Sequence, residues 1–144
     1  DRAAMVRAVA AGDIDVIVSS HDPQDADAKR RPFAEAADGA IGLETLLPAA
    51  LGLLHKGEIG LMPLLKAMTS NPAKLLGLDC GQLTKGTPAD LTLFDLNAAW
   101  VVNKDQLRAR SKNSPLDEQK VHGRVLRTMV AGRTVYQYGV EIRS

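Results

Sequence analysis

The apolar positions of the first 18 residues predict a helix followed by a strand. Apolar side chains recur at helical spacing over residues 2–11. Gly12 stands where a left-handed residue would end that helix. The β-branched residues of 13–18 then predict a short buried strand. A helix followed by a buried strand is the repeating half of an α/β architecture.

The pattern is lost between residues 19 and 42, where the chain is polar and contains Pro23, Pro32, Gly39 and Gly42. A loop of this length is uncommon inside a compact domain and is usually either functional or disordered. Composition alone favours neither interpretation over the other.

Three helices are predicted after this loop. Leucine and alanine recur at positions i, i+3, i+4 and i+7 over residues 43–54, and residues 61–68 repeat the pattern. Asn71 followed by Pro72 predicts a helix cap and a first helical residue, so a short helix is expected over 72–76.

The period then changes from 3.6 to 2, which predicts strands. Within residues 89–96, Leu91 and Leu93 alternate with Thr92 and Phe94, and residues 100–102 form a second candidate strand. Residues 125–130 and 134–138 flank Ala131-Gly132-Arg133 and predict a hairpin, with the glycine supplying a positive φ.

The change of period divides the chain into two predicted units. Residues 1–80 hold the helices and the first strand, and residues 81–144 hold a small antiparallel sheet, with the boundary between 77 and 86. Residues 103–120 are a charged connection without periodicity.

Composition narrows the function classes. The 18 Lys and Arg nearly balance the 17 Asp and Glu, so no strong field indicates a nucleic-acid or membrane-surface partner. The apolar run 43–54 is far shorter than the roughly 20 residues that cross a bilayer. A single cysteine, Cys80, excludes an internal disulfide and a multi-cysteine zinc site, and it favours the reducing cytoplasm.

Several motifs occur in an order that resembles a known family. The run "SSHDPQ…KRRPFAEAADGAIGLETLLP" is similar to the segment that closes the active site of dihydroorotases, where Thr-Asp-His-Ala-Pro-His precedes Lys, Phe and Gly-Leu-Glu-Thr. The matches continue through "SNPAKLLGL", "GQLTKGTPADLTLFDL" and "RSKNSPLDEQKVHGRVLRTMVAGRTVY". The resemblance covers nearly the whole chain.

The resemblance implies a fold of the α/β plus β class. The chain would form the C-terminal portion of an amidohydrolase, with the last strand and closing helices of a (β/α)₈ barrel in residues 1–80. Residues 81–144 would form part of the small β-sandwich. A full barrel needs about 250 residues, so the chain is expected to belong to a longer protein and to be inactive alone.

The resemblance also implies site residues, and it places two changes among them. The family's metal-binding aspartate, which serves as general acid and base, aligns with Ser20, whose neutral hydroxyl cannot take its proton. The histidine that contacts the substrate carboxylate aligns with Gln24, and Gly39 and Ala40 fall near the backbone that contacts substrate. Asp22 is a possible substitute base. His21 is a weak metal candidate, more typical of a structural hydrogen-bonding group.

These residues leave several functions open. The first hypothesis is an impaired dihydroorotase homologue that acts as a structural partner of aspartate carbamoyltransferase. The second is an active zinc-dependent dihydroorotase using Asp22 or another base, and the third is a related hydantoinase or allantoinase. Zinc is expected for active family members, although the family's His-x-His pair and bridging lysine are not found in this chain. Apolar faces on the predicted helices also predict a homo-oligomer.

Overall fold

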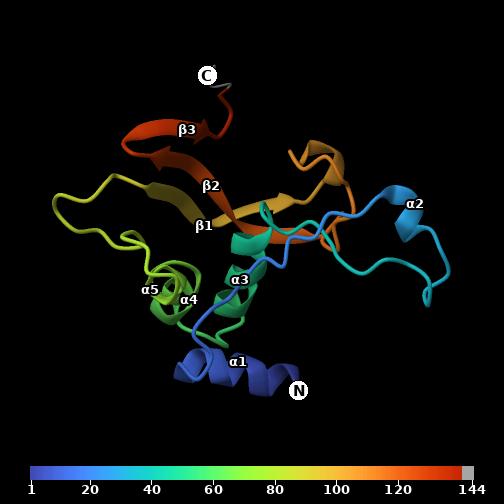
Figure 1. Ribbon diagram of the computed structural model, residues 1–144, viewed down its shortest axis with the longest axis horizontal. Coiled ribbons are helices and arrows are strands. Elements are labelled where there is room, and N and C mark those ends of the chain that lie inside the picture. The colour runs from blue at the N-terminus through green and yellow to red at the C-terminus, as the bar shows by residue number, and fades with distance from the viewer. Residues whose placement is uncertain (141–144) are drawn as a thin grey trace.

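The computed structural model describes residues 1–140 as a group of helices beside one antiparallel sheet (Figure 1). In chain order the elements are α1 (Arg2–Ala11), α2 (Ala26–Lys29), α3 (Leu46–His55), α4 (Leu61–Met68), α5 (Ser70–Leu75), β1 (Leu91–Val101), the 3₁₀ turn η1 (Lys104–Gln106), β2 (Lys120–Val130) and β3 (Arg133–Gln137). Figure 1 shows α3 between the sheet and α1, with the segment around α2 projecting to one side.

The predicted helices α1, α3 and α4 are confirmed. Gly12 ends α1 in the left-handed conformation with φ of 86°, which glycine adopts without a Cβ clash. The predicted cap at Asn71 is wrong, because α5 already begins at Ser70 and Asn71 lies inside it. The Asn71 side chain instead donates to the backbone oxygen of Asp15 at 2.9 Å. A tertiary hydrogen bond has therefore replaced the local one.

The predicted strand over residues 13–18 has no hydrogen-bonded partner strand in the described chain. The segment is tied instead to the helices, since Ile17 N donates to Ala67 O at 2.9 Å. A strand is defined by pairing, and a parallel strand needs neighbours from other βα units. Residues 1–140 do not supply such a neighbour, so the segment forms no ladder.

The sheet has the order β1-β2-β3 with both pairs antiparallel. The two strands predicted over 89–96 and 100–102 form one strand, β1, which is interrupted by a register shift between Asp95 and Ala99. The Asp95 carboxylate stabilises this irregularity by accepting hydrogen bonds from Asn97 N and Ala98 N. The predicted hairpin is confirmed, with φ of 47° at Ala131 and 79° at Gly132.

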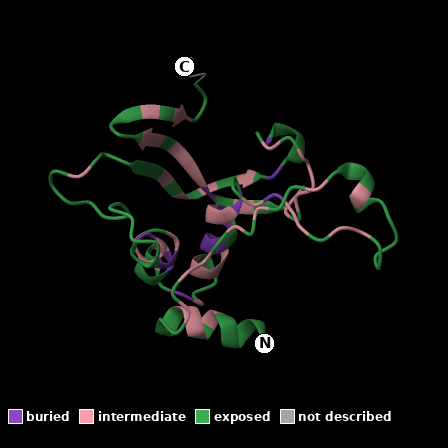
Figure 2. Cartoon of the chain, viewed as in Figure 1, coloured by how far each residue is buried: buried purple, intermediate pink, exposed green. Residues whose placement is uncertain are grey.

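Two apolar clusters hold these elements together. The first contains buried Ala50, Leu51, Ile59 and Leu64, with Leu96 of β1 packed against it. The second contains Ile41, Val102 and Leu107. Figure 2 shows the buried residues on α3, on α4 and α5, and where the sheet meets the helices. Because Leu96 packs with the helices, the sheet and the helical part share a core, and the two-unit division stays a prediction.

The polar segment 19–42 contains one element that the sequence pattern did not reveal. This is the four-residue helix α2, which begins after Asp25, where the aspartate side chain accepts a hydrogen bond from Asp27 N at 3.0 Å. None of its residues is buried. Such a short helix depends on its cap rather than on an apolar face, so no periodicity marks it.

Candidate functional site

The predicted site residues lie on two short arms that run side by side. We call residues 19–24 the first arm and residues 39–42 the second arm. His21 and Ala40 form a parallel β-bridge, and Asp22 N donates to Ala40 O at 2.9 Å. The polar loop therefore returns to its own starting point and places Ala40 beside His21.

Two glycines of the second arm allow this close approach. A Cβ on Gly39, which has φ of 102°, would collide with the Asp22 carboxylate, and a Cβ on Gly42 would collide with Ser19 O. The His21 ring adds a third contact, because its Nδ1 accepts a hydrogen bond from Gly42 N at 3.1 Å. The glycines therefore have a packing role.

The predicted residues divide between two sides of the arms. A hollow of about 680 Å³ is lined by Ser20, Gly39 and Ala40 together with apolar side chains of 17–18 and α3. His21 lines a different, smaller hollow. Asp22 is exposed, and its carboxylate lies against Gly39 without forming part of the wall beside Ser20. The structure therefore brings Ser20, Gly39 and Ala40 to one hollow, with Asp22 in contact with Gly39 and Ala40 but not in the wall. Gln24 lines neither of these two hollows.

Ser20 has an unusual backbone conformation. Its φ of 46° lies in the left-handed region, which costs a residue with a side chain about 1–2 kcal/mol. Such strain persists where the surroundings fix the backbone, and it is common at functional sites. The bridge at His21 on one side and the close contact of Ser19 O with Gly42 on the other supply that constraint.

The connection 103–120 holds the two arms together through Ser111 and Asn113, which we call the clasp. The sequence pattern did not predict this role. Asn113 Oδ1 accepts a hydrogen bond from Gln24 N at 3.4 Å, and Asn113 Nδ2 donates to Gly39 O at 3.1 Å. The backbone oxygen of Asn113 accepts from Ile41 N at 3.2 Å. Ser111 Oγ donates to Gln24 O at 2.6 Å. The available signal was the sequence Ser-Lys-Asn-Ser-Pro of 111–115, because serine and asparagine side chains often bond to backbone.

Apolar burial and a carboxylate fix the second arm and the start of α3. Ile41 is 3% exposed and packs with Val102 and Leu107. Burial of such a side chain stabilises by about 1.5–3 kcal/mol. Glu44 Oε1 accepts from Arg108 N at 2.7 Å and from Ala109 N at 3.3 Å. Glu44, just before α3, is therefore hydrogen-bonded to the connection 103–120.

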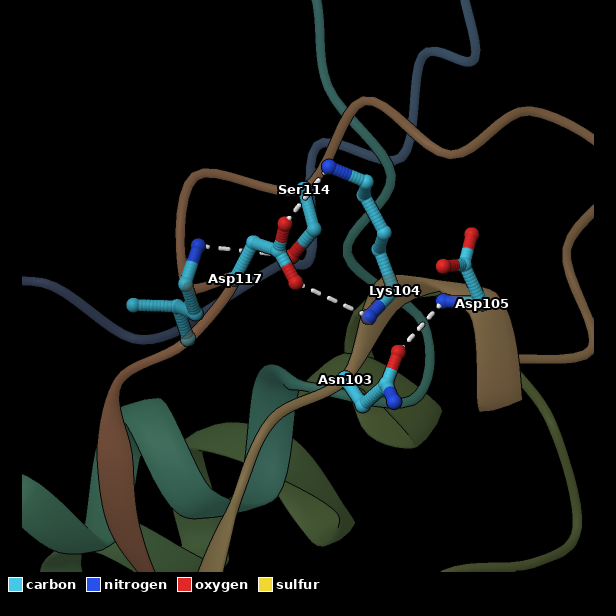
Figure 3. Close-up of polar contacts among 6 residues, drawn as sticks. Asn103, Lys104, Asp105, Ser114 and Asp117 are labelled. Carbon is cyan, nitrogen blue, oxygen red and sulfur yellow. Dashed lines mark hydrogen bonds and ion pairs between the residues drawn. The ribbon is translucent and has the colours of Figure 1, made fainter.

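An ion pair at the two ends of the connection is shown in Figure 3. Lys104 Nζ lies 2.8 Å from Asp117 Oδ2, and Lys104 N donates to Asp117 Oδ1 at 3.0 Å. The side-chain hydrogen bond from Lys104, followed by its backbone N–H, lowers the pKa of Asp117. The side-chain hydrogen bond with Asp117 in turn raises the pKa of Lys104. The ionised pair therefore closes the segment that carries Asn113.

The described residues do not form a zinc site. Within residues 1–140 there is no group of three His, Cys, Asp or Glu side chains placed to hold a metal ion. His21 uses Nδ1 as an acceptor for Gly42 N. Zinc binding by a longer protein would therefore need ligands from outside this set.

Comparison with known proteins identifies the family. Residues 1–135 match the amidohydrolase family. The chain belongs to this family. Relatives named dihydroorotase include proteins of Wolbachia sp. subsp. Drosophila simulans, 44% identical over 94% of this chain, and Pelobacter propionicus, 42% identical over 95%. The chain spans about a third of their length, 31% and 32% respectively.

Solved amidohydrolases share the fold. The L-hydantoinase of Arthrobacter aurescens superposes with a TM-score of 0.90 at 34% identity, covering 96% of this chain and 32% of that one. The D-hydantoinase of Thermus sp. also gives 0.90, at 20% identity over the whole chain and 33% of its own. The predicted relationship to the amidohydrolase fold is therefore confirmed. No helix within residues 1–140 combines the length and apolarity needed to cross a membrane.

Proposed function

We propose that the chain forms part of a longer dihydroorotase-type cyclic amidohydrolase of pyrimidine metabolism, acting between N-carbamoyl-aspartate and dihydroorotate. Support comes from the relatives named dihydroorotase, which are 42–46% identical over almost the whole chain. The ordered motifs from Ser19 to Tyr136 support the same family. The reaction closes or opens an amide ring, so it needs a group that accepts a proton from the attacking atom and returns it to the leaving nitrogen.

We propose further that catalysis is impaired in this protein. The observation that carries the proposal is the placement of Ser20 at the hollow where the family motif has aspartate. A serine hydroxyl cannot hold the proton at neutral pH, and general acid–base catalysis contributes about 10²–10⁴ in rate. Gln24 provides an amide in place of a histidine, so it can donate a hydrogen bond without positive charge.

The other residues of the site keep roles that need no proton acceptor. Gly39 and Ala40 line the hollow, and we propose that their backbone contacts the substrate there. Among the described residues the Gln24 side chain makes no hydrogen bond of its own, because the Asn113 and Ser111 contacts use its backbone. Its amide can therefore donate to a substrate carboxylate. We therefore expect the protein to bind substrate even though its catalysis is impaired.

An impaired enzyme of this family can serve as a structural subunit, and we propose aspartate carbamoyltransferase as its partner in the cytoplasm. The test mixes the purified whole protein with aspartate carbamoyltransferase of the same organism and measures the mass of the species in solution. A stable complex supports the proposal. Two separate species at micromolar concentrations would contradict this part of it, without bearing on the assignment to dihydroorotases.

An active enzyme that uses Asp22 is the second candidate. The observation in its favour is that Asp22 is exposed and has no ion pair among residues 1–140. It predicts that Asp22→Asn abolishes cyclisation of carbamoyl aspartate while Ser20→Ala changes it little. The Asp22 carboxylate lies against Gly39, but Asp22 is not among the residues that line the hollow with Ser20, and this favours the impaired protein instead.

A hydantoinase is the third candidate, favoured by the 34% identity to the L-hydantoinase of Arthrobacter aurescens. The higher identity to proteins named dihydroorotase supports the first assignment. The two differ in substrate, because dihydroorotate carries a ring carboxylate. Binding of dihydroorotate and of an uncharged hydantoin to the whole protein, measured by calorimetry, separates them.

A further inference from the structure

We infer that Asn113 is a positioning residue that holds the first and second arms in register and so fixes the backbone at the hollow. It contacts both arms, through Gln24 N on one side and Gly39 O and Ile41 N on the other. The inference about substrate contact rests on the proposed function, whereas the inference about the arms rests on geometry alone.

The amide group is suited to this task in a way that other side chains are not. Asparagine offers an acceptor oxygen and a donor NH₂ in one plane. The acceptor faces the N–H of Gln24, and the donor faces the carbonyl of Gly39. The reversed orientation would place donor against donor and acceptor against acceptor, so the two arms together select one orientation. An aspartate could satisfy the first contact but, when ionised, not the second.

Ser111 adds a second hydrogen bond between the connection and the first arm. Its hydroxyl donates to Gln24 O at 2.6 Å and also lies against Asn113 Oδ1. Because a hydroxyl has one proton, it serves one acceptor at a time. The backbone N–H and C=O of Gln24 are thus both bonded to the same short stretch of the connection.

The segment between the arms does not provide an equivalent link. Lys29 Nζ donates to Ala37 O at 2.6 Å and to Gly39 O at 3.2 Å, so it supports the second arm. It has no hydrogen bond to the first arm among the described residues. The Lys29 side chain is also exposed, where such contacts compete with water. Asn113 is half-buried and bonds to both arms.

The test measures amide hydrogen exchange in the whole protein carrying Asn113→Asp, at several pH values and corrected for intrinsic exchange rates. At neutral pH the ionised carboxylate faces the Gly39 carbonyl, so exchange at Asp22, Ile41 and Gly42 N–H is expected to rise about tenfold, the effect of losing about 1.4 kcal/mol. At acidic pH the protonated carboxyl donates again, and exchange returns toward that of the unmodified protein. A general packing defect would not reverse in this way.

Asn103→Asp is the matched control. Asn103 lies in the same connection, and among the described residues its side chain accepts only from Asp105 N, at 2.9 Å. It should leave exchange in both arms unchanged. Ser111→Ala removes one bond of the clasp and should give a smaller increase than Asn113→Asp. This second variant keeps the inference testable if Asn113→Asp does not fold.

Dihydroorotate binding to the same variants separates this inference from the proposed function. If the unmodified protein binds dihydroorotate, Asn113→Asp should weaken its affinity about tenfold at neutral pH and less at acidic pH. If it does not bind, faster exchange in the variant would still support the clasp, and only the proposed function would fail. Unchanged exchange at Asp22, Ile41 and Gly42 in both Asn113→Asp and Ser111→Ala would overturn the clasp.

Discussion

The α-carbon of Gly123 lies directly against the side chain of Leu51, so that a Cβ at residue 123 would overlap with Cδ1 of Leu51. This contact is where β2 crosses α3, and Leu51 is fully buried there. Gly123 also has φ of 97°, a conformation that favours glycine. The sheet therefore reaches the helices at a point where there is no room for a side chain.

Gly123→Ala is expected to destabilise the fold by about 2–4 kcal/mol, combining the strain of a positive φ with overpacking against Leu51. The measurement is the free energy of unfolding in urea. Gly132→Ala is the matched control, because Gly132 also has a positive φ of 79° but nothing lies within 4 Å of its Cβ position. Equal losses in the two variants would show that the contact with Leu51 contributes nothing.

Ile41→Ala is expected to cost about 2–4 kcal/mol of unfolding free energy, because it leaves a cavity beside Val102 and Leu107. The second arm should also loosen, with faster exchange at Gly42 N–H. Val18→Ala is a suitable comparison, since Val18 is 67% exposed and its truncation should cost well under about 1 kcal/mol. An Ile41→Ala protein as stable as the Val18→Ala protein would contradict the anchoring role.

The Lys104–Asp117 pair predicts a pH dependence of stability. Because the pKa of Asp117 is lower in the folded state, its contribution is present above the unfolded pKa of about 4 and is lost as pH falls through the folded value. Because the pKa of Lys104 is raised, its contribution is lost only as pH rises through that raised value. The pair thus stabilises the fold between those limits.

Asp117→Asn should lower the free energy of unfolding at neutral pH and flatten its decline in acid. The measurement is urea unfolding at a series of pH values. Asp27→Asn provides the control, since its ion pair with Arg30 is exposed on both sides, 89% and 78%, and such pairs contribute little. If the free energy of unfolding of Asp117→Asn declined in acid as steeply as that of the unmodified protein, the Lys104–Asp117 pair would not contribute to the pH dependence.

The 144-residue chain alone is expected to self-associate. The apolar faces of α3 and α4, which were expected to be exposed, pack into the core through Leu51 and Leu64. Large apolar side chains are instead exposed after α4, including Leu75 at 74%, Leu76 at 69% and Leu83 at 88%. Apolar side chains exposed to this extent favour contact with other apolar surface. The mass in solution should therefore exceed 15.4 kDa and rise with concentration. A concentration-independent monomer would contradict the prediction.

Local signals were sufficient for most of the fold. Apolar spacing predicted α1, α3 and α4, and Gly132 marked the hairpin, because each depends on residues close in the sequence. Asn71 shows the limit of such signals. Asn71 followed by Pro72 is typical of a helix start, but the Asn71 side chain instead donates a hydrogen bond to Asp15 O, 56 residues away.

The functional role of the candidate site stays a prediction, although motif order singled out residues that the structure brings together. Ser20, Gly39 and Ala40 could be found from motif order, and the structure places them around one hollow. Asn113 could not be assigned a role, because its partners lie 74 and 89 residues away in the sequence. Nothing in the local pattern of the connection states which backbone its side chains will meet.

The most direct test of the central claim is the rate of carbamoyl aspartate cyclisation by the whole protein, measured beside a dihydroorotase that has aspartate at the position of Ser20. We predict a rate lower by about 10²–10⁴, and no further loss in Asp22→Asn. A rate within a few-fold of that enzyme, abolished by Asp22→Asn, would contradict the account and establish Asp22 as the working base.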